Sequence, residues 1–447
     1  MMDSIRRLTM KTKDNTVTAI DDVTISDDFI GRIANKNIED LETFNLFLFP
    51  PKLSDIDDLD ASHFLMMANS ERIRTTNVMG IIGYKDERLF IGSRFDADND
   101  YFFYYMLKKV LNMNVINTEV NMEHQSSFLE LLIPLFPKLL NNAMKKGLYK
   151  EYKVQHHNDT NVKGTIDFKR HLKKNVPFLG NIAYNTREFS YENHVIHLIR
   201  YTIEFIKRRK NLRKVLYMND ITKENIHVIE ENSTHFASIH LAKTIHLNIR
   251  RPVRHGYYFE YQALQRLCIA ILRAESNYFK KNTNDEIYGI LFDGAWLFEE
   301  YVNTIIGDRF IHPQNTKGIG RHYLFNAANG LIYPDFISKD ALNRKIADAK
   351  YKPINNIRGR DYLQIIAYMH RFEADEGYFI YPFQENMNKT GENSLSLLSG
   401  VEHTNIREPN IKVVKSGIAI PSQKKGFNAF ERAMYEEEVK LKNRIIQ

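Results

Sequence analysis

The stretch from residue 331 to residue 352 most constrains what this chain can fold into. It contains two short apolar runs, 331–337 and 345–351, and each run carries one aspartate. The segment 338–344 between them is polar and includes Asp and Asn, which favour tight turns. Two apolar runs joined by a polar turn segment predict a β-hairpin.

The two aspartates of this hairpin, Asp335 and Asp348, can lie opposite each other on the paired strands. If they pair, the hairpin centre falls between Ala341 and Leu342, inside the polar segment. Side chains alternate along a strand, so Asp348 and Lys350 project from the same face, about 7 Å apart. Such a site would combine two carboxylates with one ammonium group. Two hard oxygen donors suit Mg²⁺, and a neighbouring lysine can orient or help to deprotonate a metal-bound water.

An exposed hairpin with an ordinary salt bridge between Lys350 and one aspartate is the alternative. A lone Pro-Asp or Asp-x-Lys would favour that simpler explanation. The spacing here is Pro-Asp, twelve residues, then Asp-Ala-Lys, which is more specific. It resembles the core of the PD-(D/E)xK nucleases. The resemblance implies catalytic roles for Asp335, Asp348 and Lys350, and it adds the backbone carbonyl of Ala349 to the metal ligands.

An acidic pair precedes the hairpin on a predicted helix. Asp293 suits the N-cap of this helix. Glu299 and Glu300 follow it and project about 100° apart. Nucleases of this superfamily often carry an acidic residue on the same helix, so the resemblance implies that Glu299 holds a second metal or a metal-bound water. The alternative is that both glutamates are solvated helix residues.

A second helix is predicted over 361–372, after the hairpin. It places Gln364 and Tyr368 four residues apart on one face. Related helicase-linked nucleases carry such a pair, which implies that Gln364 orients the scissile phosphate or water and that Tyr368 contacts the DNA backbone. Half-buried packing is the alternative for Tyr368. Lys352, on the strand face of Lys350, is expected to contact phosphate.

Other motifs exclude several functions. The chain contains no Gly-x4-Gly-Lys-Ser/Thr sequence, so it has no P-loop of its own. The segment 317–321 has too few glycines for one, and we expect it to form a loop near DNA, with Arg321 as a contact. The scattered histidines show neither His-Glu-x-x-His nor Cys/His zinc spacing.

The length of 447 residues is too great for one ordinary core and predicts two or three domains. The single cysteine, Cys268, excludes an internal disulfide and a cysteine-based metal site. We expect a reducing cytoplasm. No apolar run is long enough to span a membrane, since the longest, near 128–136, is interrupted by Glu130 and Pro134. The N-terminus lacks the apolar core of a signal peptide.

The net charge of +7 is compatible with nucleic-acid binding. Basic residues gather at 207–214 and again at 250–255. Such clusters bind phosphates well because they release condensed counterions. Solvated helix ends are the alternative for either cluster.

The order of patterns predicts an α/β chain, α+β overall, in three segments. Residues 1–100 form a β-rich module, with short strands recurring between 64 and 95. Residues 101–255 form a helical and β middle region, with an arm around 211–251. Residues 256–447 form the hairpin-bearing domain, a central mixed sheet flanked by helices.

Three further sequences extend the resemblance to one family. They are Lys-Gly-Thr-Ile at 163–166, Glu-Phe-Ser with a following Asn at 188–193, and Leu-Phe-Glu-x-Tyr-Val at 297–302. With the hairpin spacing, they resemble the McrC family, the nuclease subunits of McrBC-type and LlaJI-type restriction systems. The resemblance runs from about residue 101 onward and is strongest over 293–381.

This resemblance implies a Mg²⁺-dependent DNA endonuclease subunit, with Mn²⁺ as a substitute, acting in antiviral defence. Asp335, Asp348, the carbonyl of Ala349 and Glu299 would hold the metal. The implied partner is a separate hexameric AAA+ GTPase of the McrB type. The middle region would dock on this motor and stimulate it, while the C-terminal domain cuts double-stranded DNA. A dimer of nuclease domains would serve double-strand cleavage.

Two other hypotheses stay open from the sequence. One is a stand-alone or helicase-coupled DNA repair nuclease, which the Gln364 and Tyr368 pair motivates. The other is a non-catalytic, motor-binding adaptor on a nuclease fold. The complete set of Asp335, Asp348 and Lys350 argues against the adaptor.

Overall fold

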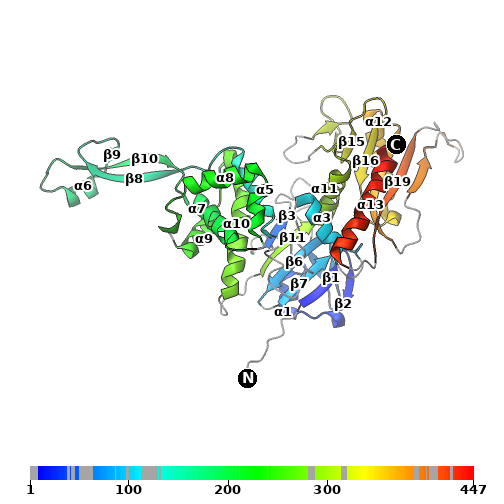
Figure 1. Cartoon of the computed structure of the whole chain (residues 1–447), viewed down its shortest axis with the longest axis horizontal. Helices are drawn as coiled ribbons and strands as arrows, with labels where there is room; N and C mark the ends of the chain where they lie inside the picture. The colour runs from blue at the N-terminus through cyan, green and yellow to red at the C-terminus, as the bar shows by residue number, and fades with distance from the viewer. Residues whose placement is uncertain are drawn as a thin grey trace, which may run out of the picture. The chain divides into compact units, whose positions relative to one another are not determined.

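The computed structural model divides the chain into two compact units (Figure 1). The first unit combines Met1–Phe128 with Thr283–Gln447, and the second is Leu129–Asn282. The second unit is therefore inserted into the sequence of the first. The described residues are 9–37, 41, 46–49, 64–85, 87–96, 100–111, 129, 132–210, 212–238, 240–279, 287–313, 320–385, 392–398, 400–401, 411–422 and 426–446.

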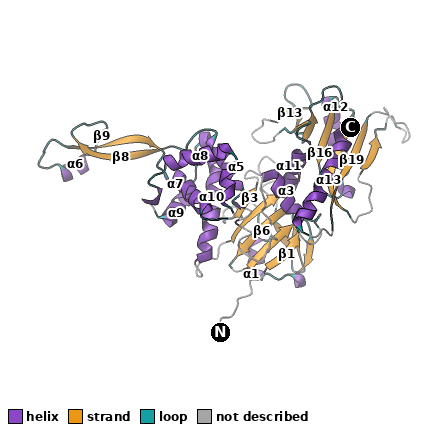
Figure 2. Ribbon diagram, in the orientation of Figure 1, coloured by secondary structure: helices purple, strands orange, loops and turns teal. Residues whose placement is uncertain are grey.

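The first unit contains a five-stranded sheet (Figure 2). In sheet order its strands are β1 (Thr9–Lys13), β7 (Glu87–Gly92), β6 (Val78–Tyr84), β11 (Ile287–Asp293) and β3 (Leu46–Phe49). Strand β11 runs antiparallel to β6 and parallel to β3. A strand from the second half of the chain thus completes a sheet whose other strands come from the first hundred residues. The segments predicted as 1–100 and 256–447 share this sheet, and their separate roles stay predictions.

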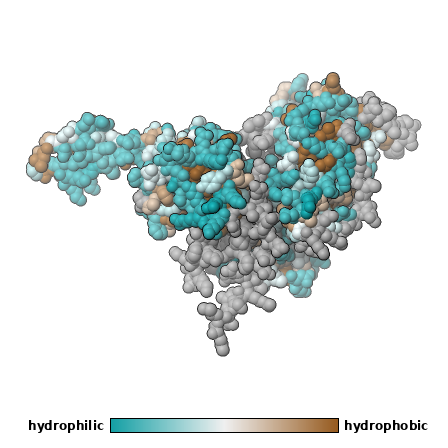
Figure 3. Space-filling view, in the orientation of Figure 1, coloured by the Kyte–Doolittle hydropathy of each residue, from teal (hydrophilic) through white to brown (hydrophobic). Residues whose placement is uncertain are grey.

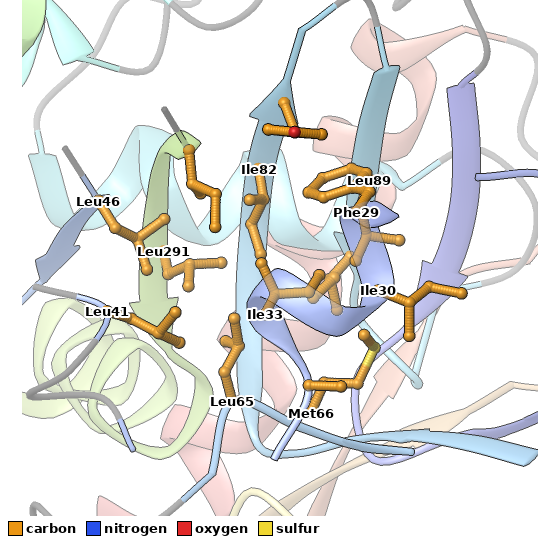
Figure 4. Close-up of a cluster of buried hydrophobic side chains, with 14 of the residues drawn as sticks. Phe29, Ile30, Ile33, Leu41, Leu46, Leu65, Met66, Ile82, Leu89 and Leu291 are labelled. Carbon is orange, nitrogen blue, oxygen red and sulfur yellow. The ribbon is translucent and has the colours of Figure 1, made fainter. Parts of the chain in front are cut away.

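A smaller sheet, an α-helix and a short 3-10 helix complete this N-terminal module. The sheet consists of β2 (Val17–Ala19), β5 (Arg72–Thr75) and β4 (Met66–Ala68), and the helices are α1 (Asp27–Ile33) and the short η1 (Ile20–Asp22). Helix α1 begins where the Ser26 side chain accepts a hydrogen bond from the Phe29 amide. Its apolar face packs on the five-stranded sheet, where Phe29 and Ile33 meet Ile82 and Leu291 (Figure 4). The strands predicted between 64 and 95 are confirmed.

The first unit also contains a six-stranded mixed sheet. Its strands are, in sheet order, β12 (Phe310–Ile311), β15 (Phe336–Ser338), β16 (Lys345–Ala349), β17 (Glu376–Gln384), β19 (Lys412–Ile420) and β18 (Glu392–Ser396). Strands β16, β17 and β19 are parallel, and β15 is antiparallel to β16. The mixed sheet flanked by helices that the sequence predicted is therefore present.

The helices that pack against this sheet are α11 (Gly294–Ile306), α12 (Gly359–Phe372) and α13 (Phe427–Ile446), with the short η6 (Ile354–Asn356) before α12. Helix α3 (Tyr101–Leu111) packs on α11 and α13, and its Phe103 contacts Phe292 of the five-stranded sheet. Helix α12 packs on the sheet face that carries Ile346, through Ile365 and Met369. On the opposite face, the Lys345 ammonium reaches the Ile445 carbonyl of α13 at 3.1 Å. The two helices therefore enclose β16 from both sides.

The predicted hairpin is present, but its first strand is shorter than expected. Residues 331–337 divide into β14 (Leu331–Ile332), which pairs with β13 (His322–Tyr323), and β15. The break falls at Pro334, which has no amide hydrogen to donate to a sheet. Phe336 pairs with Ala347, and Ile337 pairs with Ile346. When this register is extended by one residue, Asp335 lies opposite Asp348. The predicted register is confirmed.

The second unit is a group of helices from which a long hairpin projects (Figure 1). The helices are α5 (Leu135–Met144), α7 (His194–Lys207), α8 (Asp220–Glu231), α9 (Leu241–Arg250) and α10 (Glu260–Phe279), with the short η2 (Arg213–Tyr217), η3 (Phe236–Ser238) and η4 (Gly256–Tyr258). The hairpin consists of β8 (Glu151–Asp159), β9 (Thr165–Ile166), the seven-residue α6 (Phe168–Lys174) and β10 (Ile182–Ser190). Strands β8 and β10 pair along their full lengths.

The arm predicted around 211–251 is misplaced. This segment contains α8 and α9, which pack against α5, α7 and α10. The reason is that both helices are amphipathic and bury Ile226, Ile229 and Ile245, although their overall composition is polar. The projecting part is instead 151–190. No helix among the described residues is long and apolar enough to cross a membrane.

Candidate functional site

Asp335 is held from two sides. Its carboxylate Oδ2 accepts a hydrogen bond of 2.8 Å from the backbone amide of Ala349 on β16. Its own carbonyl accepts a hydrogen bond of 2.8 Å from Nδ1 of His312. The carboxylate is therefore fixed against the strand that carries Asp348.

Asp348 and Lys350 lie at the carboxyl end of β16. The Lys350 ammonium is 2.7 Å from Oδ2 of Asp348, and the two side chains are 15% and 3% exposed. This carboxylate oxygen is buried and accepts no hydrogen bond from the described residues. Its contact with the Lys350 ammonium is therefore an ion pair. The structure thus brings the three predicted hairpin residues together, with the lysine directed to one carboxylate.

Gln364 and Tyr368 connect the lysine to helix α12. The Lys350 ammonium donates to Oε1 of Gln364 at 3.3 Å. The amide nitrogen of Gln364 then donates to the Tyr368 hydroxyl at 2.8 Å, and this hydroxyl donates to the Tyr333 carbonyl at 3.2 Å. The predicted pair therefore shares one helix face and forms a chain of hydrogen bonds that ends on the residue before Pro334.

Lys352, expected as a phosphate contact, is paired with a carboxylate. Its ammonium lies 2.8 Å from both oxygens of Asp361. Asp361 also accepts from the Arg358 amide at the start of α12 and lies 3.8 Å from the Lys350 ammonium. Sequence reasoning missed Asp361, although an acidic residue in the first turn of a helix is a common capping signal.

Glu299 and Glu300 both approach His312. The Glu299 Oε1 is 3.8 Å from Nδ1, and the Glu300 Oε1 is 3.8 Å from Nε2. The His312 ring stacks on Phe336, with centroids 4.9 Å apart. The sequence favoured Glu299 over Glu300 through the family resemblance and because Glu300 projects about 100° away, whereas in the structure the histidine lies between the two carboxylates. His312 was missed because a lone histidine carries no diagnostic spacing.

The site concentrates negative charge in a poorly hydrated place. Removal of water raises the pKa of Asp335 well above its usual range, and Glu299 and Asp348 raise it further. Burial also raises the pKa of Glu299, and the negative charges of Glu300 and Asp348 raise it further. Burial lowers the pKa of Lys350, but the two aspartates outweigh it and the net direction is upward. The charges present therefore favour a cation in this site.

Asp335 and Asp348 are the residues best placed to hold a metal ion. Mg²⁺ commonly takes one or two protein carboxylates and completes its shell with water and phosphate. Two aspartates, one with a buried oxygen that lacks a hydrogen bond, fit that requirement. Within the described ranges, no group of three or more His, Cys, Asp or Glu side chains is arranged to hold a metal ion. The carboxylate of Glu299 therefore does not complete a three-residue ligand set in this arrangement.

No described contact joins the remaining predicted residues to these carboxylates. Arg321 is exposed just before β13, and residues 317–319 of its loop fall outside the described residues. In the basic cluster 207–214, Lys207 pairs with Glu230, whereas Arg208, Lys210 and Arg213 are exposed. This cluster belongs to the second unit.

Comparison with protein-family models shows to which family this chain belongs. A family described as McrBC 5-methylcytosine restriction system component matches residues 73–382, which is more than half of the chain. The chain belongs to the McrBC component family. The matched residues include Glu299, Asp335, Asp348, Lys350 and Gln364, and they also span the whole inserted unit.

Solved structures with the same family name are distant in sequence. A chain in an assembly of Thermococcus gammatolerans McrB AAA+ hexamers with bound McrC is 15% identical, with a TM-score of 0.44, over 96% of this chain and 99% of that chain. A chain of the Thermococcus gammatolerans McrBC complex is 14% identical, with a TM-score of 0.33, over 67% of this chain and 87% of that chain. Comparison with curated proteins gives no significant match.

Proposed function

We propose that this McrBC-family chain is the DNA-cutting subunit of a restriction complex and hydrolyses phosphodiester bonds of double-stranded DNA with Mg²⁺. The observation that carries the proposal is the joint placement of Asp335, Asp348 and Lys350. Asp335 is fixed on the amide of Ala349, and Lys350 is paired with Asp348. A surface hairpin with an ordinary salt bridge would not bury the Asp348 carboxylate beside a second one.

The surrounding fold supports a PD-(D/E)xK nuclease domain. Such a domain needs a central hairpin in a mixed sheet, with one helix before the hairpin and one after it. Here β15 and β16 form the hairpin, α11 precedes it, and α12 follows it. Glu299 of α11 approaches His312, which donates to the Asp335 carbonyl, and Gln364 of α12 accepts from the Lys350 ammonium.

Asp335, Asp348 and the carbonyl of Ala349 would hold the metal, with Glu299 nearby to hold a metal-bound water. When bound, Mg²⁺ would lower the pKa of its water and offset the charge that develops on the phosphate. Mn²⁺ would substitute, because the donors are oxygen atoms.

The side chains around the metal have separate tasks in this proposal. Lys350 places a positive charge and hydrogen-bond donors beside the reacting phosphate. Gln364 holds the lysine, because its carbonyl oxygen accepts from the ammonium while its amide is fixed by Tyr368. Two anchored partners restrict the lysine to a narrow range of positions, and restriction of that kind lowers the entropic part of the barrier.

We further propose that the chain works with a McrB-type AAA+ GTPase hexamer, which docks on the inserted unit. The hairpin 151–190 ends in an apolar tip that is exposed (Figure 3). The exposed apolar residues there are Phe168, Leu172, Val176, Phe178 and Leu179. Contiguous apolar residues at the end of an extended arm favour a protein partner. A solved Thermococcus gammatolerans assembly contains McrB AAA+ hexamers with bound McrC, and a partner of this kind is the occupant we propose.

Cleavage of supercoiled and methylated plasmid tests the nuclease assignment. The purified chain is assayed with Mg²⁺, with and without its GTPase partner and GTP. We expect cleavage that requires both, and its loss in Asp348→Ala. Asp340→Asn is the matched control, because Asp340 lies in the same hairpin and an asparagine keeps its acceptor for the Leu342 and Asn343 amides.

The possible outcomes separate the three hypotheses. Cleavage by the lone chain, unaffected by any motor, would support a repair nuclease instead. Stimulation of the GTPase without cleavage under any condition would support an adaptor. Unchanged cleavage in Asp348→Ala would remove the metal-site assignment.

A further inference from the structure

Tyr351, the residue after Lys350, is buried against the N-terminal module. Its ring packs on Phe298 of α11, with centroids 5.7 Å apart, and on Phe95, with centroids 5.1 Å apart. A Cβ atom on Gly294 would lie 2.9 Å from this ring, so a larger residue there would displace it. The backbone just after Lys350 is therefore held in place by the aromatic contacts of Tyr351.

Arg94 contacts the same residue in two ways. Its guanidinium lies 4.7 Å from the centroid of the Tyr351 ring, and its Nη2 donates a hydrogen bond to the Tyr351 carbonyl. The same nitrogen lies 3.2 Å from Oδ1 of Asn77. Arginine suits this place because its planar fork can serve several acceptors while its face lies on a ring.

Asp14 holds Arg94 in this position. Its Oδ2 lies 3.2 Å from the Arg94 Nη1, and its Oδ1 accepts from the Arg94 backbone amide at 2.6 Å. The Asp14 side chain has no exposed surface, so the ion pair is buried. The Tyr351 hydroxyl completes the contact through a 2.7 Å hydrogen bond with Ser93.

Lys350 is consequently fixed between two parts of the first unit. On one side its backbone amide donates to the Ile380 carbonyl of β17 at 2.8 Å. On the other side the next peptide carbonyl is held by Arg94. The direction in which the lysine side chain leaves the backbone thus depends on β17 and on the N-terminal module together.

We propose that Arg94, held by Asp14, is a positioning residue for Lys350. The N-terminal module would then set the place of the lysine ammonium relative to Asp348. This inference rests on the proposed nuclease function. Arg94 touches neither Lys350 nor the two carboxylates by any described side-chain contact, so it acts through the backbone of Tyr351.

The test compares Arg94→Gln and Arg94→Lys with Ile73→Ala, a cavity in the core of the same module. Single-turnover cleavage is measured at saturating DNA, partner and Mg²⁺, and thermal unfolding is measured for each variant. We expect Arg94→Gln to slow cleavage by about 10- to 100-fold, since small misplacements of reacting groups have effects of that size. Arg94→Lys should recover part of the rate, and Ile73→Ala should keep the rate of the unaltered chain.

Two further readouts do not depend on activity. Hydrogen exchange of the peptide 345–355 should quicken in Arg94→Gln and stay unchanged in Ile73→Ala. The affinity for Mn²⁺, measured by electron paramagnetic resonance, should change less than about twofold in Arg94→Gln, since Asp335 is held by the Ala349 amide and not by Arg94.

Three results would overturn the inference while leaving the proposed function in place. They are an unchanged cleavage rate in Arg94→Gln when Asp348→Ala is inactive, an equal loss in Ile73→Ala, and unchanged exchange of the peptide 345–355. Retained cleavage in Asp348→Ala would instead remove the proposed function, and the catalytic placement of Lys350 would fall with it.

Discussion

The Asp335 carboxylate accepts a hydrogen bond of 2.8 Å from the backbone amide of Ala349, the residue between Asp348 and Lys350. This contact fixes one carboxylate directly on the strand that carries the other. The Asp335 side chain therefore has two properties, an oxygen that accepts from the Ala349 amide and a negative charge. A substitution can remove the charge and keep the acceptor.

Asp335→Asn should abolish cleavage while leaving the fold intact. The asparagine oxygen still accepts from the Ala349 amide, but the variant lacks the charge that would hold Mg²⁺. It also removes repulsion with Asp348 and Glu299, so in EDTA it should unfold at a higher temperature than the unaltered chain. Differential scanning calorimetry with EDTA and with Mg²⁺ checks this. Equal stabilisation of both proteins by Mg²⁺ would contradict the assignment of Asp335 as a ligand.

Lys350→Met should destabilise the first unit and stop cleavage. It leaves the buried Asp348 carboxylate without its ion-pair partner, which costs on the order of 3 kcal/mol. The double variant Lys350→Met with Asp348→Asn should recover most of the stability and none of the cleavage. Urea unfolding in EDTA measures the first effect. If the double variant were no more stable than the single one, the ion pair would not explain the loss.

Gln364→Ala should reduce the cleavage rate by about tenfold, since it frees the Lys350 ammonium on one side. Tyr368→Phe should have a smaller effect, because it breaks only the outer link of the same hydrogen-bond chain. Single-turnover rates at saturating DNA check the order. A larger effect from Tyr368→Phe than from Gln364→Ala would indicate direct contact of the tyrosine with DNA.

Stability should depend on pH through Asp96. This buried carboxylate accepts from the Phe102 and Phe103 amides at the start of α3, and burial raises its pKa to about 7. Its pKa is higher in the folded than in the unfolded chain, so the folded state binds more protons between the two values. Its contribution to stability therefore falls as pH rises from about 4 to about 7.

Asp96→Asn isolates this contribution. The free energy of unfolding of the variant, relative to the unaltered chain, should increase between about pH 5 and about pH 8. Asn retains one oxygen, so the variant keeps an acceptor for one of the two helix amides and loses the other at every pH. Thermal unfolding at both pH values provides the measurement. A difference between the two proteins that does not change with pH would exclude Asp96 as the source.

Loss of the apolar tip should weaken docking without affecting the fold. Phe178 and Leu179 are 60% and 88% exposed, so replacing both with serine should leave the unfolding temperature unchanged. Assembly with the GTPase hexamer, followed by sedimentation velocity, should be weaker. Val17→Ser, at an exposed apolar position of the first unit, is the control. Full assembly of the tip variant would place the docking surface elsewhere.

Local patterns predicted much of the structure. The Asp293 side chain caps α11, as predicted, by accepting from the Ala295 amide. The hairpin register followed from the position of its turn and from the spacing of Asp335 and Asp348. Each of these features depends on residues close in sequence, which is why pattern and spacing were sufficient.

Contacts between distant segments could not be predicted in this way. His312 donates a hydrogen bond to the Asp335 carbonyl from the neighbouring strand β12, just after its last residue. Arg94 donates to the Tyr351 carbonyl from the N-terminal part of the chain. Neither residue has a distinctive spacing, because the partners are brought together only by the completed fold. The segment 211–251 was misplaced for a related reason, since its buried isoleucines contact helices from elsewhere in the second unit.

Strand β11 has a consequence for the order of synthesis. It lies between β6 and β3, so a nascent chain cannot close its first sheet until residue 293 has left the ribosome. The inserted unit, Leu129–Asn282, is made during that interval. Cutting the gene at a single point between a docking half and a cutting half would leave both products with an open sheet edge. A transplantable nuclease would have to carry the first hundred residues with it, joined to the C-terminal part across the site of the insertion.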